Sequence, residues 1–169
     1  MSPSRPALRP FGRVRLPAPT GSESAAFDAR AIEELGVPQP VLMENAGRSA
    51  AQVLQRLHPR GAVVGLVGSG NNGGDALVLL RTLAAWGRPV RGVLVADRED
   101  GTLLHGWSLE LREDGELDDE GWARLLDGAV VVDGILGTGV RGAPRERQAR
   151  AIERVNAADR PVLSIDIPS

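Results

Sequence analysis

The stretch Ala62–Asp75, AVVGLVGSGNNGGD, contains the pattern that decides the fold. Its first half, Ala62–Gly68, is a short valine-rich apolar run, which is typical of a buried strand. Its second half, Gly68–Asp75, is a glycine-rich turn that leads into a predicted helix, Gly73–Trp86. A buried strand, a glycine-rich turn and a helix in this order favour a parallel α/β fold.

The same alternation of strands and helices continues on both sides of this stretch. Further helices are predicted at Ser22–Gly36, Pro40–Leu57, Glu120–Leu126 and Pro144–Ala158, and further strands at Pro89–Ala96, near Ser108–Arg112, at Ala129–Leu136 and at Pro161–Ile167. Most of these strands are nearly continuous apolar runs, as expected when helices cover both faces of a parallel sheet. The pattern predicts a Rossmann-like three-layer α/β/α domain with a mostly parallel sheet.

The composition restricts the chemistry to oxygen groups, arginine and the backbone. The 169 residues contain no cysteine and two histidines, and all 20 basic residues are arginine. Without cysteine or lysine the chain has no thiolate metal ligand, no Schiff base and no P-loop lysine. The net charge of −2 gives no electrostatic reason to expect nucleic acid.

The first 22 residues differ from the rest of the chain. They contain four arginines, five prolines and no acidic residue, and they lack the apolar core of a targeting peptide. We expect a disordered tail at 1–22, followed by one domain at 23–169. No stretch has the roughly 18 to 20 apolar residues of a membrane span, so we expect a cytoplasmic protein without a membrane partner.

The turn after the first strand has two interpretations. Gly68, Gly70 and Gly73 form the G-x-G-x-x-G pattern, in which the backbone and the helix start accept a pyrophosphate, with Asp97 placed as a ribose partner. Alternatively, Asn72 is the N-cap of the helix and Asp75 completes a capping box, which requires no ligand. The spacing alone leaves both interpretations open.

Three acidic residues follow three predicted strands at the same edge of the sheet. They are Asp75, Asp133 and Asp166, and a second glycine-rich loop, Gly137–Ala143, comes directly after one of these strands. Clustered carboxylates raise each other's pKa unless a cation lies between them. Carboxylate, amide and hydroxyl oxygens suit an alkali or alkaline-earth ion better than zinc.

Separated motifs carry a resemblance to a known family. They are Gly36–Pro38 (GVP) with Leu42–Gly47 (LMENAG), Asn71–Asp75 (NNGGD), Asp133–Gly139 (DGILGTG) and Asp166–Ser169 (DIPS). In this order they resemble the NAD(P)H-hydrate epimerases, the YjeF N-terminal domain family. The resemblance spans residues 25–169. Domains of that family continue past the DIPS motif, so we expect the domain at 23–169 to be incomplete at its C-terminal end.

The resemblance implies an isomerase that takes part in nicotinamide cofactor repair. Its substrate is NADH or NADPH hydrated at C6 of the nicotinamide ring, NAD(P)HX, whose R and S epimers the family interconverts for a dehydratase that accepts only S. It also implies a potassium ion bound by Asn72, Asp133 and Ser169. The residues implied to bind the hydrated cofactor are Asn71, Asn72, Gly73, Gly74, Asp75, Gly137, Thr138, Gly139, Val140, Arg141, Gly142, Ala143 and Asp166.

Asp166 is the predicted catalytic residue. C6 carries both a hydroxyl and the ring nitrogen, so either loss and return of the hydroxyl or ring opening inverts it. Both routes need an acid or a base within hydrogen-bond reach, and no histidine lies in any motif. The chain departs from the family at Ala76, where glycine is frequent, and a helix tolerates alanine well.

Two other functions stay open from the residues alone. A nicotinamide-dependent dehydrogenase would use the glycine pattern but would need a further substrate domain. A non-catalytic nucleotide-binding or scaffold domain would use the same fold without the chemistry. We also expect an exposed edge at the last strand, which a homodimer would cover.

Overall fold

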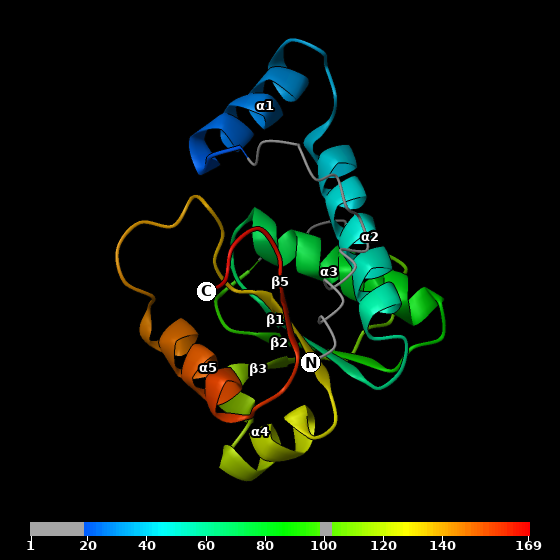
Figure 1. Ribbon diagram of the computed structural model, residues 1–169, viewed down its shortest axis with the longest axis vertical. Coiled ribbons are helices and arrows are strands. Elements are labelled where there is room, and N and C mark those ends of the chain that lie inside the picture. Colours follow the sequence, from blue (N-terminus) through cyan, green and yellow to red (C-terminus); the bar gives the residue numbers. More distant parts are fainter. Residues whose placement is uncertain (1–18, 99–102) are drawn as a thin grey trace, which may run out of the picture.

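One parallel sheet sets the position of the other elements. The computed structural model describes residues 19–98 and 103–169. Within them five strands pair in the order β3-β2-β1-β4-β5, all parallel (Figure 1). They are β1 (Val63–Val67), β2 (Val90–Leu94), β3 (Leu111–Glu113), β4 (Val130–Gly134) and β5 (Val162–Ser164). The predicted Rossmann-like fold is confirmed, and β3 lies where the short strand was expected.

Helices cover both faces of the sheet. They are α1 (Gly21–Glu33), α2 (Gln39–Leu57), α3 (Asn71–Ala85), α4 (Asp119–Leu126) and α5 (Glu146–Ala157), with a short 3-10 turn at Asp114–Glu116. Val63 and Val67 of β1 join the core that contains α2 and α3, whereas Val64 and Leu66 join the core that contains α4 and α5. All five residues of β1 are buried, which explains why the strand is apolar along its whole length.

Helix α1 differs from the other helices because none of its residues is buried. Figure 1 shows it in blue beyond the start of α2, apart from the sheet. Its start is fixed by a capping box, in which Thr20 Oγ accepts a hydrogen bond from the Glu23 amide and the Glu23 carboxylate accepts one from the Thr20 amide. A Cβ added to Gly21 would lie 3.0 Å from the Cβ of Thr138, so α1 begins against the second glycine-rich loop.

Two helix starts differ from the prediction by two residues, and the other three differ by one. Helix α3 begins at Asn71 with Gly70 as its N-cap, so the predicted capping role of Asn72 is wrong. Asn72 lies inside the first turn and is 7% exposed, with its amide directed toward the ends of other strands. Helix α5 begins at Glu146 rather than Pro144, which separates the loop Gly137–Ala143 from the free N–H groups of that helix.

The sheet order places the three acidic residues together. Strands β1, β4 and β5 are neighbours, and Asp75, Asp133 and Asp166 lie at or after their carboxyl ends, as predicted. The predicted tail at 1–22 lies mostly outside the described residues, although its last two residues belong to α1. In the described part of the chain, no helix has the length and apolar character needed to cross a membrane.

Candidate active site

The side chain of Asn72 joins three elements at the carboxyl edge of the sheet. Its Nδ2 donates to the carbonyl oxygen of Leu136, just after β4, and to that of Ile165, just after β5, at 3.0 Å for the second. Its Oδ1 is buried and has no hydrogen-bond partner. A buried amide oxygen without a partner is costly, so this atom marks a place where a donor or a cation would be stabilised.

Asp133, at the end of β4, is the centre of a closed hydrogen-bond network. Its Oδ1 accepts from the Ile135 amide at 3.2 Å and from Ser169 Oγ at 2.7 Å. Its Oδ2 accepts from Ser164 Oγ at 3.0 Å and from the Ser169 amide at 2.9 Å. Four donors satisfy both oxygens, which explains how a carboxylate that is 7% exposed is tolerated among the apolar residues of β4.

The residues expected to hold a potassium ion do lie close together. Ser169 Oγ accepts from the Leu136 amide at 3.0 Å, so the Asp133 network and the Asn72 contacts meet at Leu136. The oxygens gathered here come from an amide, a hydroxyl, a carboxylate and two main-chain carbonyls, which is a hard donor set of the kind that alkali cations use. The described residues contain no group of three His, Cys, Asp or Glu side chains able to hold a metal ion.

Asp166 connects the end of the sheet to the second glycine-rich loop. It adopts a positive φ of 67°, which is rare for a residue other than glycine, and its side chain is exposed. Its Oδ2 accepts from the Thr138 amide at 2.7 Å. A Cβ on Gly137 would lie 3.1 Å from the same oxygen, so glycine lets the loop approach this carboxylate closely.

The loop Gly137–Ala143 is open to solvent beyond this contact. The Val140 amide donates to the Gly137 carbonyl oxygen at 3.0 Å, which closes a turn. Gly142 adopts a φ of 80°, a conformation that favours glycine. From Thr138 to Ala143 every residue is exposed. The loop is therefore held at one end by Asp166, and its remaining residues are exposed to solvent.

The first glycine-rich turn is packed much more tightly. A Cβ on Gly68 would lie 2.1 Å from the Ile135 carbonyl oxygen, and one on Gly73 would lie 2.0 Å from the Gly68 carbonyl oxygen. These two glycines are required by the close approach of backbone segments. Gly70 has open space around its Cβ position, and the Arg98 guanidinium donates to the carbonyls of Gly68 and Gly70 at 3.1 and 2.6 Å.

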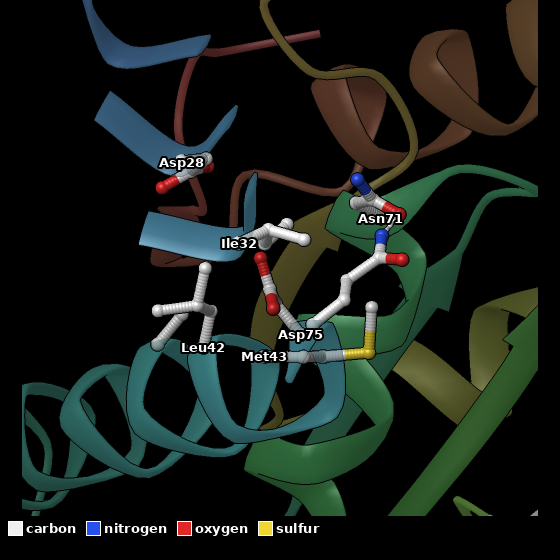
Figure 2. A pocket seen from close by; sticks show the side chains of 8 residues that line it. Asp28, Ile32, Leu42, Met43, Asn71 and Asp75 are labelled. Atoms are coloured by element: carbon white, nitrogen blue, oxygen red, sulfur yellow. Dashed lines mark hydrogen bonds between the residues drawn. The ribbon is translucent and has the colours of Figure 1, made fainter. Parts of the chain in front are cut away.

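Asp75 lies in a small pocket between α1, α2 and α3. The pocket has a volume of about 130 Å³. In Figure 2 the Asp75 carboxyl points from α3 toward Ile32 of α1, with Leu42 of α2 to one side. The lining residues are Asp28, Ile32, Gln39, Leu42, Met43, Ala46, Asn71 and Asp75. At the mouth, Gln39 Nε2 donates to Asn71 Oδ1 at 3.2 Å.

The pKa of Asp75 is raised from 3.8 to about 7. Burial contributes most, and the negative charges of Asp166 and Asp28 add to the effect, whereas Arg98 opposes it. Within the described residues, no hydrogen bond stabilises the ionised form of this carboxyl, in contrast to Asp133. Of the other two acidic residues at this edge, Asp166 contributes to the raised pKa of Asp75, after burial.

Asp97, the residue that the glycine pattern offers as a ribose partner, is already paired within the chain. Its carboxylate forms an ion pair with Arg147 of α5 at 2.7 Å. The same guanidinium binds Glu113 and Asp114 at 2.5 Å and donates to the Leu94 carbonyl oxygen at 3.0 Å. Asp97 thus belongs to a charged cluster that fixes α5 to the ends of β2 and β3.

The chain matches a known family over most of its length. A family model described as YjeF-related protein N-terminus matches residues 39–169. The chain belongs to this family. Each predicted site residue of this YjeF N-terminal domain lies in the matched range, whereas α1 and its Asp28 come before it.

Named relatives and a solved structure agree with the family. An NAD(P)H-hydrate epimerase of Rhodopirellula baltica is 34% identical over 164 residues, which cover 92% of this chain and 66% of that protein. The bifunctional NAD(P)H-hydrate repair enzyme Nnr of Pyrobaculum aerophilum is 38% identical, and the match covers 83% of this chain and 30% of that protein. The crystal structure of yeast ynu0 has a TM-score of 0.78 at 26% identity and covers 91% of this chain and 71% of that one. This chain spans less than two thirds of the length of the first two relatives.

The structure adds three residues to the site that the sequence did not single out. Arg98 follows β2 at the same edge and binds the first glycine-rich turn, a position that strand counting could have indicated. Gln39 contacts Asn71 from α2, and Asp28 contributes its charge from α1. No local pattern in these two helices predicts that contribution, since it depends on how the helices pack.

Proposed function

We propose that this YjeF N-terminal domain interconverts the R and S epimers of NAD(P)HX. The names of the relatives in Rhodopirellula baltica and Pyrobaculum aerophilum support the substrate and the repair role. The observation that carries the proposal is the contact of Asp166 with the Thr138 amide, which joins an exposed carboxylate to the glycine-rich loop. An acid–base group thereby lies beside a surface suited to a cofactor.

The two glycine-rich segments serve as the binding surfaces in this proposal. Helix α3 starts at Asn71 behind Gly70, which offers no capping side chain, so the backbone amide of the exposed Asn71 is available to an oxygen atom of the cofactor. The segments are Asn71–Asp75 and Gly137–Ala143. The second consists of exposed residues from Thr138 to Ala143, among them Arg141.

We also propose that Asn72, Asp133 and Ser169 hold a potassium ion. The unpartnered Oδ1 of Asn72 and the carbonyl oxygens of Leu136 and Ile165 support this assignment. A bound cation would supply positive charge next to an anionic cofactor. Asn72 would keep the ends of β4 and β5 together, and Asp133 would hold Ser169 in place.

In the reaction, the Asp166 carboxyl acts as an acid or a base toward the oxygen atom that is bound to C6. C6 is a hemiaminal carbon, so the lone pair of the ring nitrogen assists departure of the hydroxyl group. A positioned carboxyl contributes about 10²- to 10⁴-fold to such a proton transfer. The positive φ of Asp166 and its bond from Thr138 fix the orientation of this side chain before the substrate binds.

A coupled assay tests the function. The protein is mixed with R-NAD(P)HX and an S-specific dehydratase, and recovery of the reduced nicotinamide is followed at about 340 nm. We expect Asp166→Asn to slow R-to-S exchange at least about 100-fold while it retains substrate binding. The matched control is Asp127→Asn, since Asp127 is exposed and pairs with Arg160 away from the site. If exchange is no faster with the protein than in buffer, the epimerase function is wrong and a non-catalytic binding domain is the remaining interpretation.

The bifunctional relatives support a coupling to a dehydratase, which we propose as the consumer of the S epimer. We further propose a cytoplasmic homodimer in which the outer edge of β5 is covered. In the described residues β5 is the last strand of the sheet, and Val162 is 46% exposed. Light scattering after size-exclusion chromatography gives the mass that decides between monomer and dimer.

A further inference from the structure

We propose that Asp75 is a second acid–base residue of this site, which donates a proton to the departing C6 hydroxyl while Asp166 accepts a proton from the incoming water. The inference rests on the proposed epimerase function and deepens it. Inversion at C6 by loss and return of water requires the hydroxyl to leave from one face of the ring and water to add to the other. With two separate carboxyls, one can protonate the leaving hydroxyl on one face while the other takes a proton from water on the opposite face.

The fold brings two carboxyls to the required region. Asp75 follows the first turn of α3, which comes after β1, and Asp166 follows β5, two strands away in the same sheet. The negative charge of Asp166 acts on Asp75, so the two groups lie within electrostatic range of each other. Asp166 is exposed and bound to the loop, whereas Asp75 lines the pocket beneath α1 (Figure 2).

The surroundings of Asp75 keep it protonated in a useful range of pH. A carboxyl near a helix N-terminus is ordinarily stabilised as the anion by the helix dipole. Here burial outweighs the dipole, and Asp28 from α1 and Asp166 from the end of β5 oppose a second negative charge. Arg98, after β2, favours the anion, and the lining residues of α2 are uncharged. With a pKa of about 7, Asp75 can lose and regain its proton near neutral pH.

The proposed step balances without any other reactant. Protonated Asp75 gives its proton to the C6 hydroxyl as the C6–O bond breaks, and the lone pair of N1 forms an N1=C6 double bond as water departs. A water molecule then adds to the other face of C6, the π electrons return to N1, and the Asp166 carboxylate takes the proton of that water. Solvent carries the proton from Asp166 back to Asp75. Each inversion therefore exchanges one oxygen atom with solvent.

Two variants and one isotope measurement test this role. Asp75→Asn removes the proton but keeps the shape of the side chain, and we expect R-to-S exchange to fall at least about 100-fold with substrate binding changed less than about threefold. Asp75→Glu keeps a carboxyl and should restore part of the rate. In water enriched in ¹⁸O, the wild-type protein should incorporate label at the C6 hydroxyl at the rate of epimerisation.

Asp28→Asn is the matched variant because it removes one like charge from an exposed helix that is not needed for the core. In this variant the decline of kcat at high pH should move to lower pH. In the wild-type protein this decline should lie near pH 7, where Asp75 loses its proton. Carboxyl ¹³C resonances give the pKa of Asp75 independently of activity, through the signal that disappears in Asp75→Asn.

The outcomes separate this inference from the function on which it rests. If the wild-type protein does not accelerate exchange at any pH, the epimerase function and the role of Asp75 both fail. If the wild-type protein is active but folded Asp75→Asn keeps its rate, or epimerisation proceeds without ¹⁸O uptake, only the role of Asp75 is wrong. If the decline of kcat at high pH lies at the same pH in Asp28→Asn as in the wild type, the role of Asp75 is also wrong. This test applies even where Asp75→Asn does not fold.

Discussion

Asp133 and Asp75 lie at the same edge of the sheet in very different surroundings. Asp133 receives four hydrogen bonds, which come from Ile135, Ser164 and Ser169. Asp75 lies among Ile32, Leu42 and Met43, and its neighbouring charges are mostly negative. The first carboxylate is fully hydrogen-bonded and holds the ends of β4 and β5 together. The second gains no such stabilisation and is left able to exchange its proton.

Position alone does not assign a role to an acidic residue at a strand end. The role depends on the number of hydrogen-bond donors around each carboxyl. A carboxylate that receives several hydrogen bonds also acts on structure, because it ties together the segments that carry its donors. A carboxyl without donors is costly for folding, and that cost is characteristic of functional sites.

The largest expected effect is the loss of the Asp133 network. Asp133→Ala leaves the Ile135 and Ser169 amides and two hydroxyls without this acceptor in a place that is buried or partly buried. We expect the free energy of unfolding to fall by about 3 kcal/mol or more, as measured by urea denaturation. Asp127→Ala, which breaks an ion pair whose carboxylate is 80% exposed, should cost less than about 1 kcal/mol. Equal losses in the two variants would contradict a structural role specific to Asp133.

The strands, and the gathering of acids at one edge, were predictable because each depends on a short stretch of sequence. Buried parallel strands are continuous apolar runs, and Asp133 interrupts such a run. The role of Asn72 was not predictable, since a helix-capping residue and an interior residue look alike locally. What decides between them is its contact with the carbonyls of Leu136 and Ile165, which lie far along the chain.

The chemistry of Asp75 was only partly predictable. Its place in the acidic cluster follows from β1 and the glycine-rich turn. The size of its pKa shift depends on burial and on charges from α1, β2 and β5, which come together only in the folded chain. Asp28 in particular lies on a helix without buried residues, where a charged side chain is expected for solubility alone.

The second-largest expected effect is on the pH dependence of the free energy of unfolding, and it comes from replacing Asp75. The pKa of this carboxyl rises from 3.8 in the unfolded chain to about 7 in the folded one. The folded state therefore binds the proton more tightly, and the free energy of unfolding falls as pH rises through this range. Asp75→Asn removes the effect. Because Asp75 is partly exposed, we discount the full linkage value and expect the variant to be more stable than the wild type by about 2 kcal/mol at about pH 8.

The same two proteins should be nearly equal in stability at about pH 4, where the wild-type carboxyl is protonated in the folded state and begins to be protonated in the unfolded one. Urea denaturation at both values of pH gives the comparison. A variant that is less stable than the wild type at high pH would mean that the Asp75 carboxylate is stabilised by its surroundings. The contrast with Asp133 would then disappear.

The smallest expected effect is that of potassium, which is proposed to bind close to Asp133. If the ion binds at Asn72, the free energy of unfolding should increase by about 1 kcal/mol when potassium is about five times its Kd. Replacing potassium by choline at equal ionic strength isolates this effect from screening. Asn72→Leu removes the buried Oδ1 and should abolish the response, whereas Asp75→Asn should retain it, since Asp75 lies in the other region. Equal stability of the wild-type protein in potassium and choline would contradict the ion site and leave the Asn72 amide with a purely structural role.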